Sequence, residues 1–362
     1  MRNSDYQIYT NSQSSWDAMY QAILDSQKSI FWELYIFLDD IEGKRFFDLL
    51  EQKSRAGLDV KLVVDAFGSF WLSHRRVESL RAAGVDILFF FERKKKYRGW
   101  WKQLISRTHR KILIVDEEIG FIGGVNVDHR MKDWLDIQVR VEGKIVHSLL
   151  RSFAKSYIIC GGDKKRVKKF LKFKFRLRND ESDLILDEPH NERSVVRKKY
   201  MTALLRARER VILFSPYYFP DQKFLYALWR AKKRGVRIDL LLPLRTDVRL
   251  VTYAAYAWFK LLQKIGVNIH LTPNMMHGKG VIVDDDWAMI GSSNLDQVSF
   301  YDNYEANLEI KKSSVVKNLK NIVGEWVENA KHLTHDDLEK MGFLEVLKTK
   351  IAFGLYKLWS RK

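Results

Sequence analysis

The sequence has a single cysteine, Cys160, among 362 residues. One cysteine excludes an internal disulfide framework and a cysteine-rich zinc site, and it fits a reducing compartment. No run of about 18 or more apolar residues occurs, and Met1 to Tyr20 lack the apolar core of a signal peptide. We therefore expect neither a membrane-spanning helix nor a secretion signal in this sequence.

Acidic residues are also few relative to basic ones. The chain has 63 lysine and arginine residues against 45 aspartate and glutamate residues, which gives a formal net charge of +18. This excess favours an anionic partner: nucleic acid, an acidic membrane surface or a phosphorylated small molecule. Charge alone does not choose among them. An apolar share of 46% and a charged share of 30% predict a globular protein with a sizeable core.

Two stretches of the chain share the pattern H-x-K-x4-D-x6-G-[GS]-x-N. The first runs from His109 to Asn126, and the second runs from His277 to Asn294. Residue types agree and every gap has the same length in both copies, which chance rarely produces. The repeat makes these stretches the first candidates for a functional site.

The sequence around the two stretches repeats as well. Apolar periodicity and glycine stops predict the order helix, strand, helix, strand in each half, with Gly57 and Gly235 at matching helix ends. We expect a duplicated α/β fold, in which each half has a mostly parallel or mixed sheet covered on both faces. The predicted division is a first half (1–158), a basic inter-domain linker (159–194), a second half (195–332) and a C-terminal amphipathic basic helix (333–362).

Three segments combine basic residues with bulky apolar ones. The segment 92–102 is an insertion before the first motif and is either a solvated loop or a contact with an anionic surface. The run 164–176 carries phenylalanines among lysines, which suits lipid headgroups or a nucleic-acid groove as well as a linker. The C-terminal residues 343–359 predict a helix that either packs on the domain or docks on a membrane.

The residue types of the repeated motif suit phosphoryl chemistry. His109 and His277 each supply a nucleophile or an acid, while Lys111 and Lys279 each supply a fixed charge. An asparagine beyond a tight glycine turn adds a neutral donor, and the turn lets the backbone approach an oxyanion. Two such half-sites face to face let one imidazole attack phosphorus while the other protonates the leaving oxygen. No metal is needed for this, and no paired carboxylate cluster of the two-metal type lies near either histidine.

Carboxylates occur at matching places downstream of each motif histidine. Asp136 and Glu305 lie in strand-like sequence, and each can accept a hydrogen bond from the imidazole of its own half and fix its tautomer. Asp116 and Asp284 complete the motif and count among the catalytic candidates. The apolar strand residues before them favour a structural role, because they carry each aspartate to the far end of its strand.

The paired motifs resemble the two HKD motifs of the phospholipase D superfamily, from about Tyr20 to Val327. They are most similar to those of bacterial cardiolipin synthases that lack N-terminal transmembrane helices. The resemblance implies an α/β fold with two α-β-α sandwich halves, pseudo-two-fold symmetry, a shared active site and a phosphohistidine intermediate. It implies His109 as nucleophile and His277 as general acid and then base, or the reverse. It further implies phosphate binding by Lys111, Asn126, Lys279, Ser292 and Asn294, with Asp136 and Glu305 orienting the histidines.

By the same resemblance, a phosphatidyl group moves from one phosphatidylglycerol to another and glycerol is released. We expect no cofactor and no metal, a phospholipid substrate, an anionic membrane surface as partner, and a peripheral location on the cytoplasmic side of the cell membrane. Alternatives are a phospholipase that passes the same intermediate to water, a nuclease of the same superfamily, and a non-catalytic lipid-binding module. The basic runs contain bulky apolar residues and match no nucleic-acid module, so no nucleic-acid partner is expected.

Overall fold

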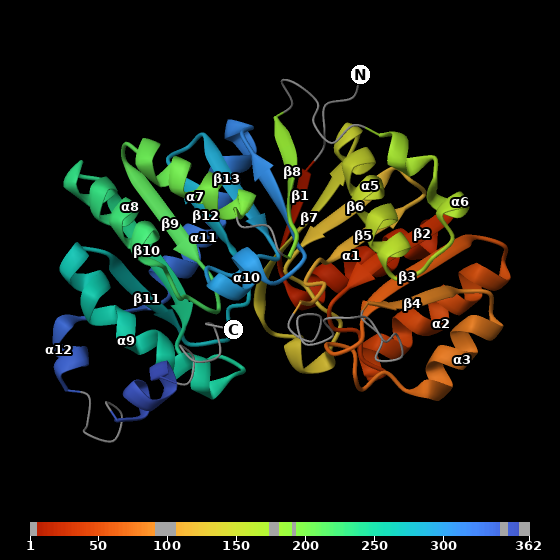
Figure 1. Cartoon of the computed structure of the whole chain (residues 1–362), viewed down its shortest axis with the longest axis horizontal. Helices are drawn as coiled ribbons and strands as arrows, with labels where there is room; N and C mark the ends of the chain where they lie inside the picture. The colour runs from red at the N-terminus through yellow and green to blue at the C-terminus, as the bar shows by residue number, and fades with distance from the viewer. Residues whose placement is uncertain (1–5, 91–105, 174–180, 190–192, 341–346, 355–362) are drawn as a thin grey trace.

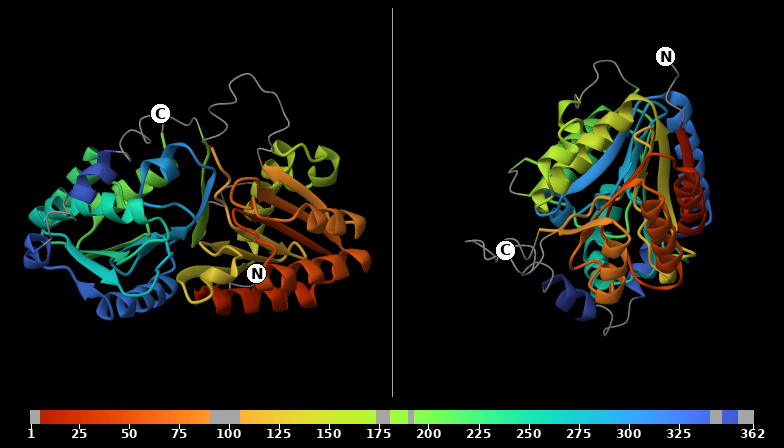
Figure 2. Two further views of the ribbon diagram at one scale, coloured as in Figure 1. Left: turned by 90° about the horizontal axis from the view of Figure 1, so that it is seen from below. Right: turned by 90° about the vertical axis from the view of Figure 1, so that its right-hand side faces the viewer.

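A computed structural model of the chain describes residues 6–90, 106–173, 181–189, 193–340 and 347–354. Figure 1 shows two halves side by side, the first drawn in red to yellow and the second in green to blue. Each half is built on one sheet with helices on both faces, and Figure 2 shows these layers from two further sides. The duplicated α/β fold predicted from the sequence is confirmed.

The first half contains a seven-stranded sheet in the order β1-β7-β6-β5-β2-β3-β4. Neighbours β2, β3 and β4 are parallel, whereas β5 runs antiparallel to β2 and is followed by the antiparallel strands β6 and β7. The elements are β1 (Tyr6–Asn11), α1 (Ser12–Asp25), β2 (Ser29–Leu34), α2 (Ile41–Arg55), β3 (Asp59–Asp65), α3 (His74–Ala82), β4 (Asp86–Phe90), β5 (Ile112–Val115), β6 (Ile119–Gly123), η1 (His129–Met131), β7 (Leu135–Glu142) and α5 (Lys144–Ile159).

The second half repeats this plan in an eight-stranded sheet with the order β15-β11-β10-β9-β12-β13-β14-β8. Strands β9, β10 and β11 are parallel, and β12 runs antiparallel to β9. The elements are β8 (Ser182–Asp187), α7 (Val195–Arg206), β9 (Arg210–Phe214), α8 (Gln222–Lys233), β10 (Arg237–Pro243), α9 (Arg249–Ile265), β11 (Asn268–Thr272), β12 (Gly280–Val283), β13 (Trp287–Gly291), α10 (Gln297–Tyr301), β14 (Glu305–Ile310), α11 (Ser313–Glu328), β15 (Lys331–His332) and α12 (His335–Glu339). The connection before β8 contains α6 (Lys164–Val167) and η2 (Phe170–Lys172), which pack beside α5 of the first half.

Alternating side chains divide each half into two cores. In β2, Ile30, Trp32 and Leu34 join the cluster that packs against α1 and α2, whereas Phe31 joins the cluster that contains α5. Successive strand residues point to opposite faces, so a sheet with helices on both faces needs apolar residues at nearly every position. This explains why the residues of this strand from Ile30 to Leu34 are apolar apart from Glu33.

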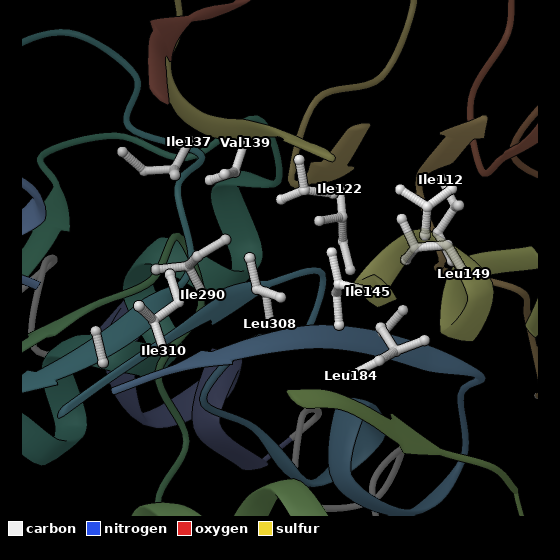
Figure 3. Close-up of a cluster of buried hydrophobic side chains, with 14 of the residues drawn as sticks. Ile112, Ile122, Ile137, Val139, Ile145, Leu149, Leu184, Ile290, Leu308 and Ile310 are labelled. Carbon is white, nitrogen blue, oxygen red and sulfur yellow. The ribbon is translucent and has the colours of Figure 1, made fainter. Parts of the chain in front are cut away.

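One core cluster contains side chains from both halves. Ile122 and Val139 of the first sheet lie opposite Ile290 and Leu308 of the second sheet, as Figure 3 shows. All four residues are fully buried. Apolar surface that is removed from water at this boundary drives the two halves together.

The strand order brings both histidine motifs to equivalent edges. Strand β5 begins with Ile112 opposite Glu33, near the carboxyl end of β2, and β12 begins with Gly280 opposite Phe214 at the carboxyl end of β9. We call this side of each sheet, where its parallel strands end, the carboxyl edge. The residues before β5 and β12 include His109 and His277, so both motifs lie at carboxyl edges.

The segment predicted as a linker (159–194) has a defined structure where it is described. Strand β8 pairs with β14 and so belongs to the second sheet. Phe170 is fully buried against Phe31, with ring centroids 5.4 Å apart, and the ring of Phe173 stacks on His147 at 4.2 Å. The interpretation of Phe170 as a lipid contact is therefore wrong, because its ring fills the core. Phe173 is partly buried against that core, and residues 174–176 of the basic run lie outside the described residues.

The other two basic segments are described in part or not at all. Within the predicted C-terminal helix, residues 347–354 are helical, and Ala352 is 1% exposed. The ring of Phe353 lies 5.5 Å from that of Trp258 on α9, so these residues pack against the domain. The segment 92–102 lies outside the described residues. Across the described ranges, no helix has both the length and the apolar character needed to span a membrane.

The shared core generates a prediction about stability. Leu308→Ala removes a fully buried side chain from the cluster that joins the halves, so the free energy of unfolding should fall by about 2–5 kcal/mol. Urea denaturation followed by circular dichroism measures this loss. Leu261→Ala is the matched control, because Leu261 is 42% exposed on α9 and its removal should cost far less. Equal losses in both variants would contradict a shared core.

Candidate active site

Backbone hydrogen bonds attach each histidine motif to the opposite half. The amide of His109 donates to the carbonyl of Tyr304 at 2.9 Å, and the amide of His277 donates to the carbonyl of Leu135 at 2.6 Å. Tyr304 and Leu135 directly precede the two downstream carboxylates in the sequence. The strand that brings a carboxylate to a histidine is therefore a strand of the other half.

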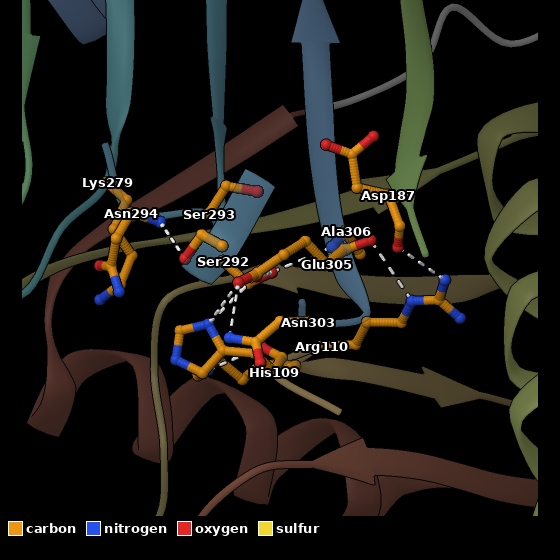
Figure 4. Close-up of polar contacts among 12 residues, drawn as sticks. His109, Arg110, Asp187, Lys279, Ser292, Ser293, Asn294, Asn303, Glu305 and Ala306 are labelled. Carbon is orange, nitrogen blue, oxygen red and sulfur yellow. Dashed lines mark hydrogen bonds and ion pairs between the residues drawn. The ribbon is translucent and has the colours of Figure 1, made fainter. Parts of the chain in front are cut away.

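The two histidine–carboxylate pairs are consequently crossed. His109 Nδ1 lies 3.0 and 3.1 Å from the two carboxylate oxygens of Glu305, as Figure 4 shows, and His277 Nδ1 lies 2.7 Å from Asp136 Oδ2. The prediction that each carboxylate orients the histidine of its own half is wrong. Backbone pairing across the boundary brings each motif beside the carboxylate of the other half, and each Nδ1 contact leaves the opposite ring nitrogen, Nε2, for other partners.

Charge holds both carboxylates in their ionised form. Burial raises the pKa of Glu305, but His109 and the Lys111 ammonium lower it more, so the net pKa lies below its ordinary value. Burial likewise opposes ionisation of Asp136, whereas His277 and Lys279 bring its pKa below the usual range. An ionised carboxylate accepts the Nδ1 proton and stabilises the imidazolium form of its histidine.

Burial acts in the opposite direction on the imidazoles. It lowers the pKa of His109 to about 4; Glu305 opposes this shift, and Lys111 adds to it. Burial and the Lys279 ammonium also lower the pKa of His277, against the effect of Asp136. Both rings are therefore neutral at pH 7 in the free protein, and a neutral imidazole has a lone pair with which to attack.

Two buried lysines lie beside the histidines. Lys111 Nζ donates to the carbonyl of His109 at 2.7 Å, and Lys279 Nζ donates to the carbonyl of His277. Burial and the neighbouring Lys279 lower the pKa of Lys111 to about 7. Burial lowers the pKa of Lys279 to about 8, although Asp136 raises it. Two mutually repelling ammonium groups at 1% exposure create a site for an anion.

Ser292 contacts the carboxylate that pairs with His109. Its hydroxyl donates to Glu305 and accepts from the backbone amide of Ala306 at 3.0 Å. The phosphate-binding role predicted for Ser292 is therefore corrected to one of positioning Glu305. At the matching place in the first half, a Cβ on Gly124 would lie 2.2 Å from Asp136 Oδ1, so only glycine fits beside the shorter carboxylate.

The two motif asparagines are buried at this edge. Asn126 is 2% exposed, and its Oδ1 accepts from the amide of Ile36 at 3.2 Å. Asn294 is 5% exposed, and its Oδ1 has no hydrogen-bond partner among the residues that the structure describes. A buried amide oxygen without a partner is costly, so Asn294 has a carboxamide available for a ligand.

The motif aspartates lie away from the histidines. Asp116 accepts hydrogen bonds from the amides of Gln27, Lys28 and Ser29, and Asp284 accepts from the corresponding amides of residues 208–210. Each follows the last residue of its strand, β5 or β12, at the end opposite the histidine. Their inclusion among the catalytic candidates is therefore wrong, and the structural interpretation holds: each binds the turn before β2 or β9.

Several residues at the site were not predicted from the sequence. The ring of Tyr35 contacts that of His109 edge-on at 5.1 Å, and Trp134 lies 5.5 Å from His277. Arg110 is fully buried and donates to the carbonyl of Glu305 at 3.3 Å and to Ser156 Oγ at 3.2 Å. Tyr35 directly follows the apolar residues of β2. This position at the end of a strand was the feature of the sequence that could have pointed to Tyr35 as a site residue. Nothing in the sequence separated Arg110 from the other basic residues.

The arrangement provides acid–base and nucleophilic groups around one anion-binding position. Lys279 lowers the pKa of His109, and Lys111 lowers that of His277, so the two motifs act on each other electrostatically. Such a constellation can perform in-line substitution at phosphorus, with one ring attacking and the other moving a proton. Within the described ranges, no group of three or more His, Cys, Asp and Glu residues is arranged to hold a metal ion.

Comparisons with known proteins find relatives over nearly the whole chain. The family model described as "Cardiolipin synthase, PLD-like domain" matches residues 19–156 and 200–326. Cardiolipin synthase 2 of Bacillus anthracis is 31% identical over 99% of this chain and 71% of its own length. Cardiolipin synthase B of Escherichia coli K12 is 30% identical over 96% of this chain and 86% of its own length.

Solved structures share the fold at lower sequence identity. Phosphatidylserine synthase of Haemophilus influenzae superposes with a TM-score of 0.76 at 12% identity and covers 98% of this chain and 93% of its own. Polyphosphate kinase of Porphyromonas gingivalis gives a TM-score of 0.62 at 14% identity, with 99% of this chain and 53% of its own covered. At such low identity, these likenesses concern the fold alone.

The crossed pairs predict which histidine each carboxylate affects. Glu305→Gln removes the negative charge that raises the pKa of His109, so the pKa of His109 should fall further while that of His277 changes little. Asp136→Asn should do the same to His277. Nitrogen-15 NMR of labelled histidine during a pH titration measures both rings. A larger effect of Asp136→Asn on His109 than on His277 would show that the pairs are not crossed.

The lysine pKa values predict how anion affinity depends on pH. Lys111 and Lys279 are charged below their pKa values of about 7 and about 8, and both become neutral as the pH rises above them. The affinity for sulfate, whose own charge is constant, should therefore be high at pH 6 and low at pH 9. A bound anion stabilises the ammonium form of the lysines. The affinity for sulfate should therefore be lost at a pH slightly above the lysine pKa values of the free protein. Calorimetry checks this, and the Lys111→Met/Lys279→Met variant should bind weakly at both pH values.

Proposed function

Because the chain belongs to the cardiolipin synthase family of phospholipase D-like proteins, we propose that it is a phosphatidyltransferase. It moves a phosphatidyl group from one phosphatidylglycerol to the hydroxyl of another, forms cardiolipin and releases glycerol. The observation that carries this proposal is the pair of crossed histidine–carboxylate contacts beside two buried lysines. This arrangement suits a double displacement, because it contains one group to attack and a second to move the proton.

In the first step, His109 Nε2 attacks phosphorus and the bond between phosphorus and the glycerol oxygen breaks. A phosphatidyl-histidine forms, and His277 gives its Nε2 proton to the departing glycerol oxygen. A pKa of about 4 keeps the His109 ring neutral and able to attack, and the lowered pKa of His277 permits the reverse assignment as well. The bound phosphodiester adds negative charge beside His277 and so raises its pKa, which lets it hold the proton for transfer.

In the second step, the hydroxyl of another phosphatidylglycerol attacks the phosphatidyl-histidine. His277 Nε2 takes the hydroxyl proton, the phosphorus–nitrogen bond breaks, and His109 returns to its neutral form as cardiolipin leaves. Lys111 and Lys279 stabilise the charge that develops on the phosphoryl oxygens during both steps, together with the carboxamides of Asn126 and Asn294. Glu305 and Asp136 hold the rings in the required tautomer through Nδ1.

The proposed substrate also defines where the protein works. Phosphatidylglycerol presents its phosphate at the surface of a bilayer, and a net charge of +18 attracts the protein to an anionic surface. The protein acts as a peripheral enzyme on the cytoplasmic side of the cell membrane. Transfer to water instead of lipid would make the same site a phospholipase, because the two reactions differ only in the acceptor.

Product analysis tests the function. We expect the purified protein to convert phosphatidylglycerol vesicles to cardiolipin and glycerol. His109→Ala and His277→Ala should each lower the rate by at least about a thousandfold, because each step needs both rings. Treatment with EDTA should leave the rate unchanged, since the side chains supply every role in the two steps.

Other products would change the conclusion. Phosphatidic acid without cardiolipin would identify a phospholipase, and cleavage of DNA without any lipid product would reject both lipid activities. Strong inhibition by EDTA would contradict the mechanism. Lys198→Ala is the control for these variants, because this exposed lysine on α7 lies away from the motifs and should retain full activity.

A further inference from the structure

Exposed apolar side chains gather in two segments that the sequence did not single out. In residues 66–72, which follow β3, Phe67 is 63% exposed, Phe70 is 68% exposed and Trp71 is 75% exposed. In residues 244–250, which follow β10, Leu244, Val248 and Leu250 are 37%, 44% and 45% exposed. We call these two segments the rim segments. Clustered exposed apolar groups of this size mark interaction surfaces.

The rim segments occupy matching places in the two halves. In the first half, β3 pairs in parallel with β2, and β2 pairs with β5, the strand that follows His109. In the second half, β10 pairs in parallel with β9, and β9 pairs with β12, the strand that follows His277. Both segments therefore leave the carboxyl edges, at which His109 and His277 lie. Each half therefore contributes one rim segment beside the active site.

Direct contacts join the first rim segment to the site. Asp65 accepts hydrogen bonds from the amides of Phe67 and Gly68, and its other oxygen accepts from the amide of Thr108 at 3.1 Å. A Cβ on Gly68 would lie 2.8 Å from the ring of Tyr35, which in turn contacts His109. The backbone of this segment is thus fixed beside the catalytic histidine while its aromatic rings point outward.

The second rim segment is fixed in the same way. The amide of Leu244 donates to the carbonyl of Thr272 at 2.9 Å, and Thr246 Oγ1 donates to the carbonyl of Val248 at 2.8 Å. Tyr217 donates to Asp247 Oδ1 at 2.6 Å, and Asp247 is close enough to raise the pKa of Lys279. Hydrogen bonds thus fix the backbone of both segments next to the site, and the exposed apolar side chains project from this fixed backbone.

We infer that the two rim segments are the surface with which the protein docks on a phospholipid bilayer that contains phosphatidylglycerol. This inference rests on the proposed function and names the part of the chain that brings the site to its substrate. Phenylalanine and tryptophan favour the interfacial region of a bilayer. The guanidinium of Arg107 lies 4.6 Å from the ring of Phe67. Arg245 is an exposed member of the second segment, and exposed Arg75 follows the first segment in the sequence, so cations that can contact anionic headgroups accompany the apolar groups.

Docking by both segments would place the lipid phosphate over the two histidines. A lipid whose acyl chains stay in the bilayer must present its headgroup to the site from the membrane surface. With one apolar segment on each side of the site, the protein can rest on the bilayer without tilting toward either half. Phe170 of the basic run 164–176 is buried and takes no part in this contact.

The test removes exposed apolar groups and leaves the catalytic residues unchanged. The rim variant is Phe70→Ser/Trp71→Ser/Val248→Ser/Leu250→Ser. Cosedimentation with phosphatidylglycerol vesicles should show affinity at least about tenfold weaker than that of the wild type, a difference of about 1.4 kcal/mol. Cardiolipin formation from vesicles should fall with it, whereas turnover of a short-chain phosphatidylglycerol below its micelle concentration should stay within twofold.

A matched control separates the position of the aromatic residues from their chemistry. Tyr226 and Trp229 on α8 are 54% and 41% exposed and stack on each other, with Arg230 and Lys233 over their rings. Figure 1 shows α8 on the outer flank of the second half, away from the boundary between the halves. Tyr226→Ser/Trp229→Ser should therefore bind vesicles like the wild type.

Other results of these binding measurements would contradict the inference. Wild-type vesicle affinity in the rim variant, or an equal loss in the α8 control, would overturn it. Trp71→Phe keeps an aromatic ring and should retain most of the affinity, so equal losses in Trp71→Phe and Trp71→Ser would also contradict it. His109→Ala should bind vesicles normally. If the wild type makes no cardiolipin from either form of substrate, the proposed function fails, while the binding measurements still report on docking.

Discussion

Two hydrogen bonds between a histidine of one half and a carboxylate of the other are the contacts on which the site depends. Each places an ionised carboxylate in a buried position, which is costly unless a close partner compensates it. His109 provides that partner for Glu305, and His277 provides it for Asp136. Neither half alone satisfies its own charges. The shared apolar core therefore matters for chemistry as well as for stability, because it brings the two halves close enough to form both pairs.

The pseudo-symmetry of the two half-sites is incomplete, and side-chain length explains where it breaks. Asp136 is one methylene shorter than Glu305, so its carboxylate lies where a Cβ on Gly124 would clash. Glu305 reaches farther and leaves room for Ser292, whose hydroxyl holds it. Arg110, which donates to the carbonyl of Glu305, also occurs on one side only, since Gly278 occupies the matching position. The carboxylate of the second half is thus held by more contacts than its counterpart, which suits different tasks for the two histidines.

The same strand order that assembles the site also determines what surrounds it. Parallel strands end at one edge, and the loops that follow them collect there with both motifs. The sequence made basic segments with scattered aromatics the candidates for membrane contact, beside a loop, a linker or a helix packed on the domain. Phe170 instead fills the core, whereas Trp71 and Phe70 are exposed beside the site. Composition identifies side chains that suit a membrane, but only their position relative to the packed layers decides which of them water can reach.

The sequence by itself determined the duplicated α/β fold, the strand-helix alternation and the two motifs, because periodicity and spacing are local properties of the chain. It also favoured the structural role of Asp116, since the four residues of β5 separate it from Lys111. It missed β1, β8 and Arg110, whose roles depend on partners far along the chain. Only the tertiary structure decided that Glu305 holds His109 and Asp136 holds His277. Each motif is hydrogen-bonded to the strand of the other half, and no spacing within one half encodes that exchange.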